Sequence, residues 1–432
     1  MANYKKQLAK KDREVKAAQK QQTPTIATES AKKMISQSCP DGILNLQFTP
    51  IDTWFFRESR PHDAAGASEL SSLFPPPVRT LMGAVRSFLG DSLGVDWKKF
   101  NLNSECTELK QAIGDGETLG ALSINGAWVC KNGQRLYPAP CYLMQKADEF
   151  IRLQIGEVVE CDLGKVRLPE LQKNKDSKKI EGGYKGLEQT WITREGWQKL
   201  LKGETPLKEE LIQAKDLLGN EPRLGIARDN SARSVIEGRL YQTQHLRLEN
   251  DVTIELDVKG LNETLAEQLP VETKHEILRL GGEGRMAVLA KKSHYLPLPI
   301  LTIDKQPLKK IIIHFITPAY FDGHMFPENF DKHEIDGQTV WQGKLLDIEL
   351  IVEAAVIGKA HREGGWNMQK HKPRAVKSYI PAGSAWFCRV VTEVSSKDLL
   401  EKLHGQSIGA ETEWGRGQIL IGVWNDIKTQ EK

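Results

Sequence analysis

Apolar residues alternate with polar ones in several short runs of this chain. Residues 43–50 read ILNLQFTP and residues 252–258 read VTIELDV, and both runs have the period of two that is typical of strands. Four further apolar runs predict strands at residues 310–318, 345–357, 384–394 and 419–424. Ordered structure is therefore expected to begin at Ile43.

One longer run has helical spacing instead. After three prolines at residues 75–77, the apolar residues Leu81, Val85, Phe88 and Leu89 fall on one face of a helix expected over residues 78–93. Shorter helices are predicted at residues 193–201 and 397–404. The Asn-Gly pairs at residues 125–126 and 132–133 predict hairpin turns, and residues 163–186 are expected to form a polar, mobile insertion.

The order of these elements predicts an α+β fold with two domains. Two strands, a helix and a strand near the C-terminus fit half of a ferredoxin-like fold. A glycine-rich run, LRLGGEGRMAVLA at residues 278–290, precedes the expected boundary. We predict a flexible tail over residues 1–38, a first domain with insertions over residues 39–290, and a second domain over residues 291–432.

Composition places the chain among ordinary soluble proteins and separates a basic tail from a near-neutral body. Hydrophobic residues make up 39% and charged residues 27% of 432, and the mean hydropathy is −0.44. No run approaches the roughly 18 apolar residues of a membrane span, and no secretory signal is visible, so a cytoplasmic protein is expected.

Residues 1–38 hold nine basic and three acidic residues, so they carry a net charge of +6. The remaining residues carry −3, which gives the net charge of +3 for the chain. A nucleic-acid site must therefore be a local patch.

Cysteine and nucleotide motifs exclude several classes of chemistry. The six cysteines form no C-x-x-C pair, which favours free thiols and gives no support for a zinc site. A phosphate-binding G-x-x-x-x-G-K-[ST] loop is missing from the sequence, so nucleotide hydrolysis has no motif. We expect neither a metal nor another cofactor.

Two basic clusters are candidates for nucleic-acid binding. Five arginines lie within 25 residues, at Arg223, Arg228, Arg233, Arg239 and Arg247. Guanidinium groups suit phosphate oxygens, although a salt-bridged surface loop is the alternative interpretation. The second cluster, residues 359–377, has six basic residues, one acid and a central tryptophan. Such a segment can grip single-stranded nucleic acid, or it can be a solvated loop that the tryptophan anchors.

Histidines keep a catalytic alternative open. A metal-independent ribonuclease needs a base near a 2′-hydroxyl, and His62, His245, His361 and His371 lie near arginines or in the basic loop. The loop at residues 280–286 can cradle a phosphate through its backbone amides or simply form a tight turn.

Six motifs, in order along residues 43–425, resemble those of one known family. They are WFFRESRPHDAAG, FPPPVRTLMGAVRSFLG, EPRLGIARDNSARSVIEGRLYQTQHLRLE, LGGEGRMA, IPAGSAWF and IGAETEWGRGQ. Together they resemble the Cmr subunit, a member of the RAMP superfamily, that caps the crRNA 5′ end in type III-B CRISPR effectors. The long N-terminal tail has no counterpart in this pattern.

The resemblance implies a fold, a role and partners. It implies two ferredoxin-like, RRM-related domains with inserted hairpins and a C-terminal glycine-rich loop. It implies binding to the 5′ handle of crRNA, docking on the large polymerase/cyclase-type subunit and on the first RAMP backbone subunit, and only indirect contact with target RNA. It also implies that the chain does not cut the target.

The matching motifs and the basic clusters give a set of expected RNA-binding residues. They are Arg57, Arg60, Arg79, Arg86, Arg223, Arg228, Arg233, Arg239, Gly281, Gly282, Gly284, Arg285, Lys370, Lys372, Arg374, Trp414 and Arg416. We expect them to converge on a shared groove. Two alternatives stay open: a RAMP endoribonuclease that processes precursor crRNA, and an assembly subunit that touches only proteins.

Overall fold

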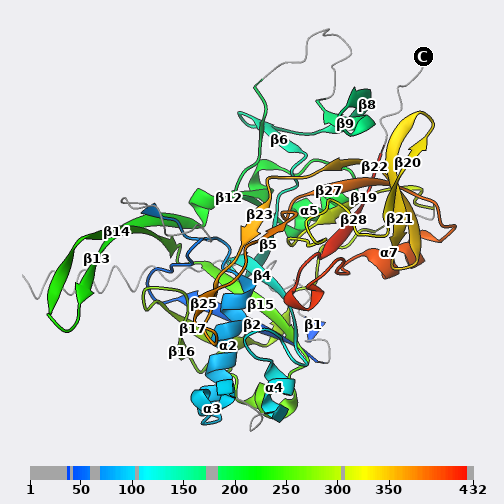
Figure 1. Ribbon diagram of the computed structural model, residues 1–432. Coiled ribbons are helices and arrows are strands. Elements are labelled where there is room, and N and C mark those ends of the chain that lie inside the picture. The colour runs from blue at the N-terminus through cyan, green and yellow to red at the C-terminus, as the bar shows by residue number, and fades with distance from the viewer. Residues whose placement is uncertain are drawn as a thin grey trace, which may run out of the picture. The chain divides into compact units, whose positions relative to one another are not determined.

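The structure is a computed structural model that describes residues 37–38, 42–58, 69–102, 107–171, 183–302 and 307–425. The chain divides into two units, Met1–Ser38 and Cys39–Lys432, and the two large sheets belong to the second unit (Figure 1). The predicted basic tail lies outside the described residues except for residues 37–38, and Arg60 and His62 also lie outside them.

The first sheet has eight strands in the order β12-β11-β5-β4-β15-β2-β17-β16. In chain order they are β2 (Ile43–Pro50), β4 (Ser123–Lys131), β5 (Gln134–Pro138), β11 (Thr190–Thr193), β12 (Leu211–Gln213), β15 (Val252–Lys259), β16 (Glu276–Arg279) and β17 (Met286–Lys292). The strands predicted at residues 43–50 and 252–258 are confirmed as β2 and β15, which pair antiparallel. Their alternating apolar residues, such as Leu46 and Leu256, are fully buried.

Helix α2 (Val78–Ser92) packs on this sheet through the apolar face that the sequence predicts. Leu81, Val85 and Leu89 are fully buried, while Phe88 is partly buried at the edge of the core. Pro77 precedes the first helical residue, where its missing N–H costs nothing. Helix α2 connects β2 to β4 through α3 (Trp97–Leu102) and α4 (Thr107–Ile113), and α6 (Glu263–Glu267) connects β15 to β17.

The second sheet has six strands in the order β20-β21-β22-β27-β19-β28. They are β19 (Lys310–Phe315), β20 (Phe330–Ile335), β21 (Gln338–Leu345), β22 (Ile348–Val356), β27 (Ala385–Val390) and β28 (Ile419–Val423). The four strands predicted from apolar runs are confirmed, as is the helix predicted before the last strand, α7 (Ser396–Leu403). The connection from β19 to β22 runs through the β20–β21 hairpin.

Buried residues of both sheets meet around α5 (Arg194–Leu201). Trp197 of this helix lies in one apolar cluster with Tyr137 of the first sheet and Leu420 of the second. The same cluster contains Leu301, from the segment that leads into the second sheet. The two sheets therefore share a continuous apolar contact.

Several short sheets lie outside these two. β13 (Leu218–Asp229) and β14 (Ser234–Leu248) form a long hairpin that pairs with β3 (Glu69–Leu70). Further pairs are β8 (Gln154–Cys161) with β9 (Gly164–Glu170), β23 (His361–Glu363) with β26 (Lys377–Tyr379), and β24 (Trp366–Asn367) with β25 (Lys372–Pro373). A three-stranded sheet joins β6 (Leu143–Lys146), β7 (Glu149–Arg152) and β10 (Lys185–Gly186).

The two Asn-Gly pairs behave differently. Asn132 and Gly133 form the β4–β5 turn with φ of 50° and 74°, as the sequence predicts. The hairpin predicted at Asn125-Gly126 is wrong, because β4 runs straight through it. Ala127 is an extra residue there, so the register with β15 shifts by one. In the predicted insertion, β9 occupies residues 164–170, and residues 172–182 lie outside the described part of the chain.

Candidate nucleic-acid interface

The β13–β14 hairpin extends away from both sheets (Figure 1). Ile226 pairs with Leu240 across it, and Leu224, on the same face, is 72% exposed. The exposed apolar side chains of the hairpin are Leu224, Ile226, Val235, Ile236 and Leu240. A monomeric surface seldom displays so many apolar residues on one projecting element, so the hairpin has the character of a contact surface.

The end of this hairpin is basic and solvent-exposed. Arg228 and Arg233 are both exposed, and Arg233 has a φ of 53° in the turn. The Asp229 carboxylate shapes the turn by accepting hydrogen bonds from the backbone N–H groups of Ser231 and Ala232, at 2.8 and 3.1 Å. The hairpin end therefore presents two guanidinium groups on a defined turn. The side chain of Arg239 lies outside the described residues.

The base of the hairpin carries a second group of arginines. Arg223 and Arg247 lie on β13 and β14, and each binds both Glu221 and Asp52. Arg285 binds Asp52 at 3.2 Å. We call these five residues the hairpin-base cluster. It brings Arg223 and Arg285 together, and it includes a surface salt-bridge network, which was the alternative interpretation for the arginine series.

The glycine loop beside this cluster is a tight turn. The backbone N–H of Gly282 donates to the Phe55 carbonyl at 2.8 Å. Gly281 has a φ of 90°, and a Cβ there would meet the Phe55 carbonyl oxygen at 2.6 Å. Gly284 has open space around it. Gly281 and Gly282 therefore serve close packing on Phe55, and the turn places Arg285 at the hairpin base.

His245 does not face solvent. Its ring is 1% exposed and stacks on Phe55 at 5.2 Å, and its Nδ1 lies 3.1 Å from the Thr53 hydroxyl. Burial lowers the pKa of His245, and the positive charges of Arg223 and Arg285 lower it further. The ring is therefore neutral at pH 7 and, in this conformation, out of reach of a 2′-hydroxyl.

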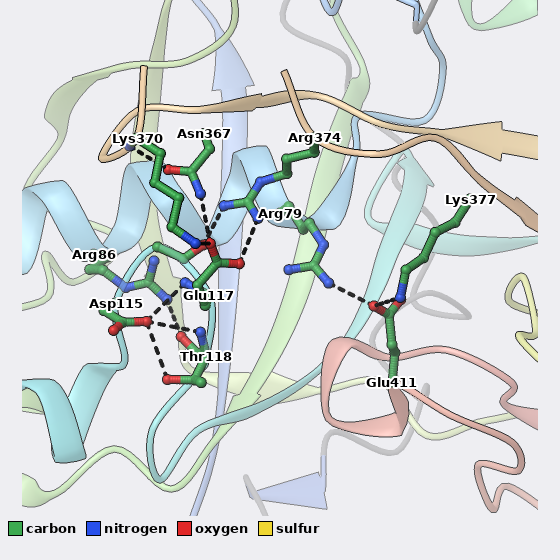
Figure 2. Close-up of polar contacts among 11 residues, drawn as sticks. Arg79, Arg86, Asp115, Glu117, Thr118, Asn367, Lys370, Arg374, Lys377 and Glu411 are labelled. Carbon is green, nitrogen blue, oxygen red and sulfur yellow. Dashed lines mark hydrogen bonds and ion pairs between the residues drawn. The ribbon is translucent and has the colours of Figure 1, made fainter. Parts of the chain in front are cut away.

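A second cluster joins α2 to the C-terminal basic segment (Figure 2). Glu117 accepts hydrogen bonds from Lys370, Arg374 and Asn367, at 2.8, 3.1 and 2.8 Å. Lys370 and Arg374 lower the pKa of the Glu117 carboxyl. Arg86 of α2 donates to the carbonyl oxygens at the two ends of the same loop, those of Ile113 and Thr118. Arg86, Lys370 and Arg374 thus hold a loop in place.

Glu411 binds the remaining residues of this cluster (Figure 2). We call the cluster the clasp; it consists of Arg79, Arg86, Glu117, Lys370, Arg374, Lys377 and Glu411. Its carboxylate accepts hydrogen bonds from Arg79 of α2 at 2.9 Å and from Lys377 at 3.0 Å. Tyr379 donates to the other carboxylate oxygen at 2.8 Å. Burial raises the pKa of Glu411, but these three partners outweigh it, so the pKa is lowered.

The C-terminal glycine-rich loop is part of the core. Trp414 is 4% exposed and lies in the apolar cluster of the first sheet. Arg416 is 3% exposed and pairs with the buried Glu363 at 2.5 Å. We predicted both side chains to bind RNA, but neither has the solvent-exposed surface that this requires. Trp414 instead packs the C-terminal loop into the first core, and Arg416 forms a buried ion pair within the C-terminal half of the chain.

The expected site residues therefore do not converge on one shared groove. Most of them lie in two clusters that share no residue, the hairpin with its base and the clasp. Lys372 is exposed on β25, and Arg57 is exposed where it bridges to Ser72. Trp366 is 55% exposed and does not anchor its loop to the core.

A broad cavity of about 1010 Å³ lies beside the residues that lead into β13. Lys146, Lys185 and Lys215 line it together with Glu188. The remaining lining residues are Gln145, Ala147, Gly183, Gly186, Leu187, Gln189, Thr190, Gln213 and Ala214. Its charge is positive on balance.

Three further features of the described part of the chain concern metal ligands, thiols and apolar helices. No group of three or more His, Cys, Asp or Glu side chains there has metal-binding geometry. Cys130, Cys141, Cys161 and Cys388 are free thiols, as predicted for these four. Among the described helices, none is both long and apolar enough to cross a bilayer.

Comparison with known proteins identifies the family. The family described as CRISPR-associated protein (Cas_Cmr3) matches residues 46–424. The chain belongs to this family, which confirms the predicted resemblance to the Cmr-type subunits of type III-B CRISPR effectors. No curated protein matches the chain.

Solved structures show distant likeness. A chain of the type III-B Cmr-beta complex bound to cognate target RNA and AMPPnP has 14% identity and a TM-score of 0.42, over 79% of this chain and 86% of that one. A chain of the Csm3-Csm4 subcomplex of a type III-A complex has 10% identity and a TM-score of 0.36, over 89% and 100%.

Proposed function

We propose that this chain is a non-catalytic subunit that binds the 5′ handle of crRNA in a type III-B effector complex. The observation that carries the proposal is the β13–β14 hairpin, which combines exposed apolar side chains with Arg228 and Arg233 at its end. Single-stranded RNA is commonly bound by stacking or wedging against its bases while cations neutralise its phosphates. The hairpin offers both kinds of contact on one element.

The strand orders support two ferredoxin-like domains. In the first sheet, the order β17-β2-β15-β4, with α2 between β2 and β4 and α6 between β15 and β17, follows the βαββαβ pattern. In the second sheet, the order β28-β19-β27-β22 follows the same pattern, with α7 as its second helix and the β20–β21 hairpin in place of its first. We place the boundary between the domains at residues 290–291.

Protein partners have a separate candidate surface. Hairpin β8–β9 exposes Val158, Val159, Leu163 and Leu168, each between 41% and 48%. This apolar surface suits the large polymerase/cyclase-type subunit, and the RAMP backbone subunit then lies further along the bound crRNA. Target RNA meets the chain only indirectly. The assembled ribonucleoprotein works in the cytoplasm.

The non-catalytic assignment rests on the histidines. His245 is buried with a lowered pKa, and His314 is buried with a pKa lowered by burial to about 3. Neither is available as a base for a 2′-hydroxyl. The ribonuclease alternative would then need His62, His361 or His371.

Crosslinking in the co-purified complex tests the handle-binding role. With 4-thiouridine placed at each handle position, we expect adducts on the hairpin at residues 218–248. Adducts on other subunits only would leave this chain as an assembly subunit. Incubation of the isolated protein with repeat RNA, with and without divalent metal, tests the enzyme alternative. Site-specific cuts that His62→Ala, His361→Ala or His371→Ala abolishes would establish a ribonuclease.

A further inference from the structure

Three arginines converge on one carboxylate at the hairpin base. Asp52 lies in the bend that follows β2, and its Oδ2 is 3.0 Å from Nη2 of Arg223 and 3.2 Å from Nη1 of Arg285. Its Oδ1 is 2.9 Å from Nη2 of Arg247. The three guanidinium groups come from β13, β14 and the turn before β17, so three separate segments supply cations to a single anion.

The arrangement leaves donors for a larger anion. Arg223 and Arg247 each use Nε and Nη2 for Glu221 and Asp52, and among the described residues neither Nη1 has an acceptor. A guanidinium carries five N–H donors, and a phosphate offers more acceptor positions than a carboxylate. A phosphate in the place of Asp52 would accept hydrogen bonds from the arginine N–H groups that Asp52 now binds. It would also accept them from Nη1 of Arg223 and Nη1 of Arg247.

Charge and exposure also permit an exchange. Three arginines face two acids, Asp52 and Glu221, so the hairpin-base cluster has a net charge of +1. A phosphodiester carries one negative charge, as the Asp52 carboxylate does, so an exchange conserves the charge facing the arginines. Asp52 is 47% and Arg247 52% exposed, so both lie where an RNA strand can reach them.

We propose that Arg223, Arg247 and Arg285 form a binding site for an RNA backbone phosphate, which Asp52 occupies in the RNA-free protein and from which the RNA displaces it. Asp52 then lowers the affinity for RNA by competing for the arginines. This inference rests on the proposed RNA-binding function for the identity of the ligand. It adds Arg247 and Asp52, which our sequence-based set of site residues does not contain.

The Asp52 carboxylate is an effective competitor at neutral pH. Hydrogen bonds from Arg223 and Arg247 lower its pKa, so it is ionised whenever RNA is present under physiological conditions. Exposed ion pairs contribute only about 0–1 kcal/mol to stability, so removing the carboxylate leaves the fold intact.

Asp52→Asn tests this competition directly. Fluorescence anisotropy of the full chain would use two RNA probes of equal length, a repeat-derived handle and an unrelated single strand. We expect both RNAs to bind about threefold to tenfold more tightly, because a self-occupied site has an affinity reduced by its free fraction. Asp148→Asn is the matched control, since Asp148 is 79% exposed and pairs with Lys208 elsewhere. Asp148→Asn should change the affinity for neither of the two RNAs.

A second variant separates competition from a general charge effect. In a variant with Arg223, Arg247 and Arg285 all replaced by Ala, Asp52→Asn should not change the affinity for RNA. The reason is that no arginine is left for which Asp52 and a phosphate could compete. Arg247→Ala alone should weaken binding of both RNAs. Thermal unfolding of each variant checks folding, and Asp52→Ser replaces Asp52→Asn if the latter is destabilised.

The outcomes distinguish this inference from the proposed function. Equal or weaker binding by Asp52→Asn, relative to Asp148→Asn, overturns the phosphate site even if the wild-type protein prefers the handle. Tighter binding of both RNAs without any preference for the handle supports the phosphate site and contradicts handle recognition by this chain alone. A wild-type protein and variants that bind neither RNA contradict both.

Discussion

The guanidinium carbon of Arg79 lies 4.0 Å from the centre of the Trp414 ring. Arg79 is on α2, in the first part of the chain, and Trp414 is near its C-terminus. The same arginine pairs with Glu411, which is 332 positions away in the sequence. The terminal glycine-rich loop is therefore part of the packing that unites the two halves of the molecule.

Trp414→Ala should destabilise the protein strongly. Because the ring is 4% exposed and fills the first core, we expect a loss of about 3–5 kcal/mol in the free energy of unfolding. Chemical denaturation measures this loss. Trp366→Ala is the matched control, since Trp366 is 55% exposed and its removal should cost no more than about 0.5 kcal/mol. Equal losses would contradict the burial of Trp414.

The Glu363–Arg416 pair should make stability depend on pH in an acidic window. Burial raises the pKa of Glu363, but Arg416 and His361 together outweigh it and lower the pKa from 4.5 to about 2. A carboxyl with a depressed pKa in the folded state stabilises the protein above the unfolded value, and this contribution is lost as the pH falls from 4.5 toward 2. The loss is on the order of 3 kcal/mol.

Glu363→Gln checks this pH dependence. In denaturation curves at successive pH values, the variant should be less stable than the wild type at pH 7, and the difference should shrink below about pH 4. A constant difference across this window would show that the carboxylate charge is not what stabilises the pair.

Glu117→Gln should loosen the basic segment. Glu117 binds Lys370, Arg374 and Asn367, and these bonds tie the two-residue strands β24 and β25 to the loop before β4. We expect faster hydrogen exchange in residues 366–374, measured by mass spectrometry, with little change in global stability. Lys372→Ala serves as the control, because its exposed side chain does not contact Glu117, and it should leave exchange unchanged.

Gly281→Ala and Gly284→Ala should differ although the two glycines share a turn. A Cβ at Gly281 would lie 2.6 Å from the Phe55 carbonyl oxygen, whereas Gly284 has open space. Both have positive φ, so each substitution costs about 1–2 kcal/mol in backbone conformation. Gly281→Ala should cost more because of the clash. Similar unfolding midpoints for the two variants would argue against a packed turn.

Arg228→Ala combined with Arg233→Ala should weaken crRNA retention in a salt-dependent way. Each arginine that neutralises a phosphate of a single strand contributes about 0.7 to the slope of log affinity against log salt, so the double variant should lose up to about 1.4 in slope. Filter binding at several salt concentrations measures it. Lys397→Ala with Lys402→Ala, on α7, is the control of equal charge. An unchanged slope would remove the hairpin end from the site.

Sequence patterns predicted the regular elements well because their apolar residues are also the buried ones. Strands β2 and β15 and helix α2 follow directly from spacing. The turn predicted at Asn125-Gly126 was wrong, because a glycine in a strand can mark a bulge as readily as a turn. The buried ion pairs of Arg135 with Glu255 and Asp257, at 2.9 and 2.6 Å, were also not predicted, since Arg135 on β5 is distant in sequence from the two acids on β15 and reaches them across β4.

The site was predicted only in part, for a related reason. Basic residues in the sequence suggest anion binding, but their partners are decided by the fold. Glu117, Glu363 and Glu411 carry no local signal, yet they engage the clasp arginines and Arg416. Arg228 and Arg233 remain exposed because a two-stranded hairpin has no further layer to supply acids.

The β13–β14 hairpin also makes the isolated protein prone to aggregation. β13 is twelve residues long and displays Leu224 and Ile226, and among the described strands its outer edge has no partner. An exposed edge strand of this kind can pair with a strand of a second molecule, and repeated pairing of this kind leads to aggregation. Production of this subunit without its RNA and neighbours should therefore yield aggregates, and co-expression should keep it dispersed.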